Sequence, residues 1–356
     1  MKKRPLLSDV AKLAGVSTAT VSAIVNNMDG QNIRVNPETR ERVLAAIAEL
    51  GYVANPAARI LARGKNKLIG IFTYEPIFPF KHHDFYYPFL LGIEEEAEAQ
   101  GYNLLIFTNV TNPDGKRSVY HEGASQLSMA DGSILLGLNE DKDELRRLYK
   151  EGHSFVYVGR REVPDTTISY TAADYVTATQ QLTDLLFDLG HKNLVYVSLP
   201  RWIESNEDRK QGFINSYLKH GSKTGPESFV NIKPDQINSD VVQSLLNRGV
   251  TGAVVENDFL ANALLRQLKT LGLSVPADFS ITLCGNPQTV TEDAPDWTMF
   301  TIPRREMGIY AVRLLVKQLQ TIGSVAPEYV DLPCTMVAGH TIAPPSEKRA
   351  QGGKQI

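Results

Sequence analysis

Residues 16–27 read VSTATVSAIVNN, and this short stretch combines a helical pattern with an unusual outer face. Val21, Ile24 and Val25 recur at the spacing of one face of a helix, and Ser17 is a favoured N-cap residue. The residues that would face outward are small and hydroxylated, where a solvated helix commonly carries Lys and Glu. The pattern predicts a short helix whose N-terminal turns press against another surface.

Two further helices are predicted around this one. Ser8 is a good N-cap for a first helix, and Gly15 can form the tight turn that follows it. Asn36-Pro37-Glu38 opens a third helix with a cap, a proline at the first position and an acid at the positive end of the dipole, and Gly51 ends it. Two short helices about a glycine turn, completed by a third, predict a helix-turn-helix domain over residues 1–54.

The charge of this N-terminal region differs from that of the rest of the chain. Residues 1–67 carry eleven Lys or Arg against five Asp or Glu, a balance of +6, whereas the whole chain has a net charge of −3. A basic head on an acidic body indicates that the head binds a polyanion, although a basic face that is merely solvated is the alternative.

A helix that enters the major groove explains the small outer residues of 16–27. Hydroxyl groups can contact phosphate oxygens, and a Thr methyl can touch thymine. By position, Ser17, Thr20 and Ser22 are predicted to contact phosphates, and Thr18 and Ala19 to face base edges. The alternative is that Ser17 is only a cap and that Thr20 and Ser22 are tolerated helix residues.

Residues 55–66 form a predicted hinge helix or linker. Asn55 and Pro56 again read as a cap and first helical position, but so short a helix is marginal in water on its own. Leu61, flanked by Arg59 and Arg63, could insert into a minor-groove step and kink the duplex. A plain linker is the alternative.

The segments LSDVAKLAGVSTATVSAIVNN (7–27) and RVNPETRERVLAAIAELGYVANPAARILARG (34–64) resemble the DNA-binding head and hinge helix of the LacI/GalR family of bacterial transcription regulators. The resemblance implies base-reading positions at Thr18, Ala19 and Ala23, and an intercalating Leu61 beside Ala58. Ala23 stands where many members have Arg, and residues 27–34 lengthen a loop, so the operator sequence stays open. The predicted DNA-binding set is Ser17, Thr18, Ala19, Thr20, Ser22, Ala23, Asn26, Ala58 and Leu61.

Beyond Lys67, short apolar runs alternate with amphipathic segments. The runs read as buried parallel strands: LIGIF, NLLIF, GSILLG, SFVYVG, NLVYVSL, GAVVEN and SITL. This rhythm predicts an α/β core over residues 67–342 in which helices cover both faces of open parallel sheets. There are more strands than one sheet comfortably holds, which favours two lobes with a ligand site in the cleft between them, at the carboxyl ends of the strands.

The resemblance to the family continues more loosely to about residue 342, through GYNLLIF, DGSILLG, EDRKQGF and IAPP. It implies a bilobal core of two Rossmann-like sheets, like that of periplasmic binding proteins, which also mediates dimerisation. The implied lobe crossings lie near residues 170, 298 and 330. The predicted N-lobe is about 67–170 and 299–329, the C-lobe is about 171–298 and 330–342, and 343–356 is a disordered tail.

The same resemblance implies an effector site. Its predicted contacts are Phe85, Tyr86, Asp174, Arg209, Asn257 and Asn286. Several have structural alternatives: core burial for the two aromatic residues, a role at the lobe crossing for Asp174, and a surface ion pair with Glu207 or Asp208 for Arg209. Asp258 is predicted to be structural. Asn286 stands where many members have an Asp that holds sugar hydroxyls, which leaves the effector's identity open.

Other classes of protein find little support. The sequence has no nucleotide-binding G-x-G-x-x-G or P-loop, no G-x-S-x-G and no H-E-x-x-H, and its two cysteines lack metal-ligand spacing. His82, His83 and Asp84 are interpreted as solvated and not as metal ligands. No long apolar run and no signal-peptide pattern occurs. An enzyme and a secreted solute-binding protein are therefore the remote alternatives, and no cofactor, metal or membrane partner is expected.

The sequence is interpreted as a cytoplasmic, homodimeric transcription regulator, a repressor rather than an activator. Two-fold symmetry predicts a pseudo-palindromic operator on double-stranded DNA. A small-molecule effector, of which a sugar is the first candidate and a purine-type corepressor the alternative, would control operator affinity. The tail SEKRAQGGKQI has no apolar heptads, which disfavours a tetramerising coiled coil.

Overall fold

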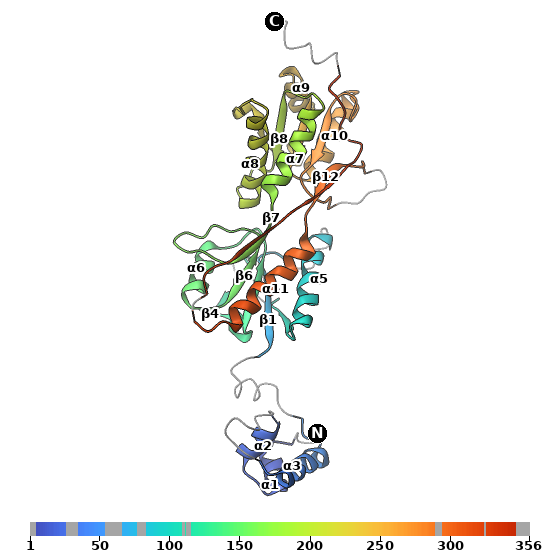
Figure 1. The fold of residues 1–356 in the computed structure, drawn as a ribbon. Helices are drawn as coiled ribbons and strands as arrows, with labels where there is room; N and C mark the ends of the chain where they lie inside the picture. The colour runs from blue at the N-terminus through green and yellow to red at the C-terminus, as the bar shows by residue number, and fades with distance from the viewer. Residues whose placement is uncertain are drawn as a thin grey trace. The chain divides into compact units, whose positions relative to one another are not determined.

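A computed structural model describes residues 5–25, 35–53, 66–76, 83–108, 111, 115–288, 294–323 and 325–346. The chain divides into two compact units, residues 1–66 and residues 67–356 (Figure 1). The predicted hinge helix, including Ala58 and Leu61, lies outside the described residues, and so does most of the predicted tail. Within the described part of the chain, no helix is long and apolar enough to cross a membrane.

The first unit is a helix-turn-helix domain, as predicted. It contains α1 (Leu7–Ala14), α2 (Thr18–Val25) and α3 (Pro37–Leu50). Val10, Val21 and Val43, one from each of these helices, are completely buried against one another in its core. Gly15 and Gly51 end α1 and α3 in the left-handed conformation that glycine adopts without strain.

The caps of these helices agree with the sequence at two of three places. The Ser17 Oγ accepts a hydrogen bond from the Thr20 N–H at 3.1 Å, and the Asn36 Oδ1 accepts one from the Glu38 N–H at 3.1 Å. The prediction of Ser8 as N-cap was wrong. The cap is Leu6, because the Asp9 carboxylate accepts a hydrogen bond from the Leu6 N–H at 2.8 Å and so closes the first turn two residues earlier.

The second unit contains an N-lobe built on one sheet. Its described strands run in the order β13-β7-β6-β5-β1-β2, and they pair in parallel. Their bounds are β1 (Leu68–Thr73), β2 (Asn103–Ile106), β5 (Gly132–Leu136), β6 (Phe155–Val158), β7 (Tyr170–Ala173) and β13 (Tyr329–Leu332). Helices α5 (His83–Ala99) and α11 (Arg304–Gln320) pack on one face. Helix α6 (Lys142–Lys150), the hairpin β3 (Tyr120–His121) and β4 (Ala124–Ser125), and the short helix η1 (Gln126–Met129) lie on the other.

The C-lobe repeats this plan. Its described strands run in the order β14-β12-β11-β10-β8-β9, all parallel except β14, which is antiparallel to β12. Their bounds are β8 (Leu194–Ser198), β9 (Phe229–Asn231), β10 (Gly252–Val255), β11 (Ser280–Leu283), β12 (Thr298–Thr301) and β14 (Thr335–Val337). Helices α7 (Tyr175–Asp188) and α8 (Glu204–Lys219) cover one face, and α9 (Ser239–Asn247) and α10 (Asp258–Thr270) the other (Figure 1). The short helices η2 (Pro226–Ser228) and η3 (Pro234–Gln236) flank β9.

Each apolar run that was read as a strand forms one, and the predicted two-sheet α/β core is confirmed. The lobe crossings lie three or four residues beyond the expected positions, after β7, β12 and β13. Residues 171–173 and 330–332 therefore belong to the N-lobe sheet, and residues 299–301 to the C-lobe sheet. The reason is that β7 and β13 extend one edge of the N-lobe sheet, and β13 alternates exposed and half-buried residues, so the sequence shows no apolar run there.

Glycines allow two helix pairs to approach closely. A Cβ at Gly308 of α11 would collide with the carbonyl oxygen of Phe89 on α5, and a Cβ at Gly212 of α8 would collide with that of Val176 on α7. These contacts fix α11 and α8 against their neighbours. Both helices carry arginines toward the cavity described next.

Candidate functional site

A cavity of about 500 Å³ lies between the two lobes of the core. Its walls come from the loops at the carboxyl ends of strands in both sheets, where open parallel sheets bind ligands. Five of the predicted effector residues line it: Phe85, Tyr86, Arg209, Asn257 and Asn286. Asp174 is not among the lining residues. It is instead the N-cap of α7, and its carboxylate accepts a hydrogen bond from the Thr177 N–H at 2.9 Å.

Arg209 enters the cavity from α8 and is only 7% exposed. Its guanidinium stacks 3.9 Å from the ring centre of Tyr175, and its Nη1 donates to the Ser205 carbonyl at 3.0 Å. The alternative of a surface ion pair was wrong. Glu207 pairs with Lys210, and Asp208 pairs with Arg160 across the lobes at 2.6 Å.

Arg304 is a second cationic residue of the cavity, and it was not among the predicted effector contacts. It is the first residue of α11, is 8% exposed and lies with its guanidinium 4.8 Å from the ring centre of Phe85. Burial lowers its pKa, and the charge of Arg209 lowers it further. Its position was the available signal, because it follows Ile302 and Pro303 directly after a strand, at a predicted lobe crossing.

Two carboxylates of the cavity already have partners within the protein. The Glu75 Oε1 accepts from the N–H groups of Leu138 and Asn139 at 2.8 Å each, and its Oε2 accepts from the Tyr86 hydroxyl at 2.5 Å. The Glu256 Oε2 accepts from the Leu199 N–H at 2.7 Å, and its Oε1 lies 3.8 Å from Arg201. These acids shape the cavity wall more than they offer charge to a ligand.

The aromatic residues combine a structural role with their place in the cavity wall. The rings of Phe85 and Tyr86 meet edge-on with centres 5.0 Å apart, and the face of Phe85 supports Arg304. Tyr86 is 6% exposed, and burial together with Glu75 raises the pKa of its hydroxyl, which therefore stays protonated and donates to that carboxylate.

The asparagines also have structural partners. The Asn257 Oδ1 caps α10 by accepting from the Leu260 N–H at 3.1 Å, and the Asn286 Oδ1 accepts from the Ile302 N–H at 2.8 Å. With the carbonyl oxygens engaged, the amide NH₂ groups are the donors suited to a ligand. Asp258 accepts from the Gln288 N–H at 3.1 Å and is almost completely buried, in agreement with its predicted structural role.

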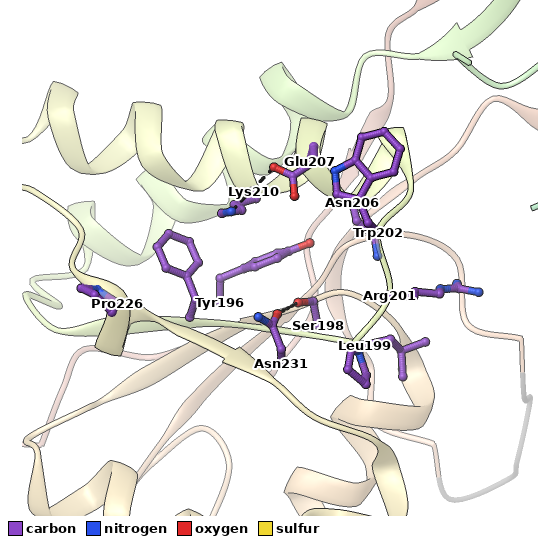
Figure 2. A pocket seen from close by; sticks show the side chains of 12 residues that line it. Tyr196, Ser198, Leu199, Arg201, Trp202, Asn206, Glu207, Lys210, Pro226 and Asn231 are labelled. Atoms are coloured by element: carbon purple, nitrogen blue, oxygen red, sulfur yellow. Dashed lines mark hydrogen bonds and ion pairs between the residues drawn. The ribbon is translucent and has the colours of Figure 1, made fainter. Parts of the chain in front are cut away.

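A groove of about 540 Å³ adjoins the cavity on the C-lobe (Figure 2). The groove and the cavity share Leu199, Arg201 and Asn206. Trp202 at its rim is 55% exposed, and the Lys142 ammonium lies 4.7 Å from its ring centre. Both amide atoms of Asn206 are buried without a hydrogen-bond partner among the described residues, so this part of the wall suits a polar guest or ordered water.

Charged residues join the lobes beside the cavity. Glu204, at the start of α8, accepts from Lys142 at 2.9 Å and from the Glu162 N–H at 3.0 Å, and it lies 3.7 Å from Arg161. Arg161 is in turn 3.0 Å from Glu140. Because Glu204 belongs to the C-lobe and its partners to the N-lobe, this ion network holds the two lobes together.

The cavity shows no sign of nucleophilic chemistry at its thiol. Burial raises the pKa of the Cys284 thiol to about 12, so it stays protonated. No group of three or more His, Cys, Asp or Glu side chains in the described part of the chain could hold a metal ion. His82 and the side chains of His83 and Asp84 lie outside the described residues.

In the head, the exposed N-terminal turn of α2 presents the predicted DNA contacts. Ser17, Thr18 and Ala19 are exposed, Thr20 and Ser22 are half-buried, and the Ser17 and Thr20 hydroxyls are 2.9 Å apart. Ala23 is only 5% exposed, although it is not among the residues of the head's apolar core. Its role as a base-reading residue stays a prediction. Asn26 lies outside the described residues.

Comparison with known proteins agrees with both units. Residues 6–55 match the model for bacterial regulatory proteins of the lacI family, and residues 183–342 match a periplasmic binding protein-like domain. The transcriptional regulator CelR of Thermobifida fusca is 31% identical over 89% of this chain and 93% of its own length. The chain belongs to the LacI family. Catabolite control protein A of Priestia megaterium, another relative of this LacI-family chain, is 29% identical over 87% of this chain and 91% of its own.

Solved structures show the same fold. A complex of the transcriptional regulator CelR with cellobiose matches 95% of this LacI-family chain and all of its own, with 27% identity and a TM-score of 0.64. A lac repressor dimer bound to operator matches 96% of this chain and all of its own, with 24% identity and a TM-score of 0.68. The relatives of the present chain are transcriptional regulators and not enzymes. This LacI-family protein is itself a DNA-binding transcriptional regulator.

Proposed function

We propose that this LacI-family protein is a homodimeric repressor whose affinity for a pseudo-palindromic operator is controlled by a small molecule bound between the lobes. The observation that carries the proposal is the interlobe cavity, whose polar lining comes from both lobes of a chain that also contains a helix-turn-helix head. Two similar structures, a CelR complex with cellobiose and a lac repressor dimer bound to operator, support a sugar effector and a dimer.

The cavity's geometry suggests how the effector would act. Arg209 and Asn257 reach it from the C-lobe, and Phe85, Tyr86 and Arg304 from the N-lobe. A ligand that contacts both sets binds one lobe arrangement better than another, and so shifts their equilibrium. Residues 55–66 lead directly into β1 of the N-lobe sheet, so a lobe movement reaches the predicted hinge segment through the chain. Coupling of about 1–3 kcal/mol, or 5–150-fold in affinity, is typical of such control.

Selection from random duplex DNA tests the DNA-binding part of this proposal. We expect enrichment of a pseudo-palindrome, and Thr18→Ala should relax the preference at one base position in each half-site. Leu61→Ala should weaken operator binding far more than effector binding. Equal loss of both activities would contradict the assignment of residues 55–66 as a hinge, and enriched sequences without two-fold symmetry would contradict the dimer.

The effector can be identified by measuring the thermal unfolding midpoint of the protein in the presence of sugars, sugar phosphates and purines. A ligand that binds the folded state raises the midpoint in a concentration-dependent way. Operator affinity with and without that ligand then gives the sign of control. A ligand that stabilises the core and leaves operator affinity unchanged would contradict the proposed regulation.

A further inference from the structure

Two buried guanidinium groups from opposite lobes line the same cavity. Arg209 lies on α8 of the C-lobe and Arg304 on α11 of the N-lobe, and they are 7% and 8% exposed. A buried cation is costly unless an anion pairs with it. The question is therefore which anion neutralises them.

The protein's own carboxylates do not pair with either arginine. Among the described residues, no salt bridge includes Arg209 or Arg304, and the Arg209 Nε is buried without a hydrogen-bond partner. The acids nearby are committed elsewhere: Glu207 to Lys210, Asp208 to Arg160, Glu256 to Arg201, and Glu75 to Tyr86 and backbone N–H groups. Asp258 acts favourably on Arg304 through its charge, but its Oδ2 binds the Gln288 N–H.

Aromatic rings hold both guanidinium groups in place. Arg209 stacks on Tyr175 at 3.9 Å and Arg304 on Phe85 at 4.8 Å, measured to the ring centres. A stacked guanidinium keeps its N–H edge available, and this planar fork matches the two oxygens of a carboxylate or phosphate. The two positive charges also repel each other: burial lowers the pKa of Arg304, and the charge of Arg209 lowers it further. An anion between them would remove both penalties.

We propose that the effector is an anionic sugar derivative, a sugar phosphate or a sugar acid, whose oxyanion is bound by Arg209 and Arg304 from the two lobes. The inference rests on the proposed function, because it takes the interlobe cavity as the effector site. The amide groups of Asn257 and Asn286 are donors for the hydroxyl groups of the sugar. Since the two arginines belong to different lobes, the anion would also draw the lobes together.

Thermal unfolding of the full-length protein tests the charge requirement. Inorganic phosphate, glucose 6-phosphate and glucuronate are compared with glucose, each at up to about 10 mM and at an ionic strength held constant with sodium chloride. At least one of the anions should raise the midpoint in a concentration-dependent way, more than glucose does. Titration calorimetry then gives its Kd for each variant.

Arg304→Gln should raise that Kd by about tenfold to a hundredfold, as expected for a lost charge-assisted contact, and Arg304→Lys should lose less. Arg305→Gln is the matched control. The Arg305 side chain is about half exposed, pairs with Glu95 at 2.5 Å and lies outside the cavity. The substitution therefore removes the same charge as Arg304→Gln, but from the adjacent residue. This control should leave Kd unchanged within about twofold.

Two results would overturn the inference: no anion stabilises the wild type at about 10 mM, or glucose and the anions bind wild type and Arg304→Gln alike. Operator binding is measured separately and distinguishes the two proposals. A neutral ligand that changes operator affinity would refute the anionic effector and leave the proposed regulator standing. Loss of sequence-selective DNA binding by the wild type would refute the regulator and leave the anion measurement interpretable.

Discussion

Replacing Glu204 by Gln tests how much the ion network between the lobes contributes to stability, separately from the rest of the core. The Glu204 side chain is completely buried, and its carboxylate is held by Lys142, Arg161 and the Glu162 N–H. Gln keeps the size and one acceptor oxygen but removes the charge. Arg161 retains Glu140 at 3.0 Å, and the side chain of Lys142 is 31% exposed and can be hydrated.

These contacts set the expected magnitude. Removing one partner of a buried ion pair costs about 3–5 kcal/mol. The remaining acceptor and the hydrated Lys142 place this substitution lower, at about 2–3 kcal/mol of the free energy of unfolding. For a large domain about 1 kcal/mol corresponds to roughly 2–4 °C, so the melting temperature should fall by roughly 4–12 °C.

The pH dependence gives a second signature. Burial raises the pKa of Glu204, but Lys142, backbone N–H groups and Arg161 outweigh it, so the pKa lies below its ordinary value. A carboxyl with a depressed folded pKa stabilises above its unfolded pKa, about 4.3, and loses this contribution as the pH falls through the folded value. The difference between wild type and Glu204→Gln should be constant from about pH 8 to 5 and shrink below about pH 4.

Urea unfolding and thermal scans of both proteins measure this effect. Glu207→Gln on the same helix is the matched control, since its carboxylate is 44% exposed and pairs only with Lys210 at 3.6 Å among the described residues. It should cost less than about 0.5 kcal/mol. Equal stability of the two variants, or a Glu204→Gln effect that persists below about pH 4, would refute the reasoning.

Three further substitutions test other parts of the structure. Gly308→Ala should destabilise the core by about 1–3 kcal/mol in urea unfolding, because the new methyl group meets the Phe89 carbonyl; unchanged stability would contradict the close contact of α5 and α11. Tyr86→Phe should cost about 1–2 kcal/mol by removing the hydroxyl that Glu75 accepts, and a neutral result would show that this bond is dispensable. Ser17→Asp should keep the cap on α2, measured by hydrogen exchange of the head, while weakening DNA binding by charge repulsion; wild-type affinity would refute a phosphate contact at Ser17.

The fold was predictable where local chemistry decides it. Caps such as Asn36 and apolar runs such as that of β10 carry their own signal, because they depend on neighbouring residues in the sequence. The edge strands β13 and β14 lack such a signal. They are exposed or half-buried, and only their pairing with β7 and β12 makes them strands. Because β13 has no apolar run, the sequence placed its lobe crossing only approximately, near residue 330.

The candidate site was predictable in position but not in charge. The strand-end rule and the family resemblance located Arg209 and Asn257 in the cavity wall, whereas Asp174 proved to be the cap of α7. The sequence could not show that Asp208 pairs with Arg160 from the other lobe. Because of this pairing, Asp208 is not a partner for Arg209. Charge balance at a buried site depends on tertiary contacts, and a list of charged residues does not reveal it.

Helix α8 connects the ion network and the cavity. Glu204 and Asp208 are one helical turn apart and both pair with N-lobe residues, while Arg209, the next residue, lines the cavity. A movement that pulls α8 away from the N-lobe must break these pairs and displace Arg209 at the same time. A ligand at the proposed site and the ion network would therefore favour the same lobe arrangement, and any signal that opens the lobes would have to overcome both.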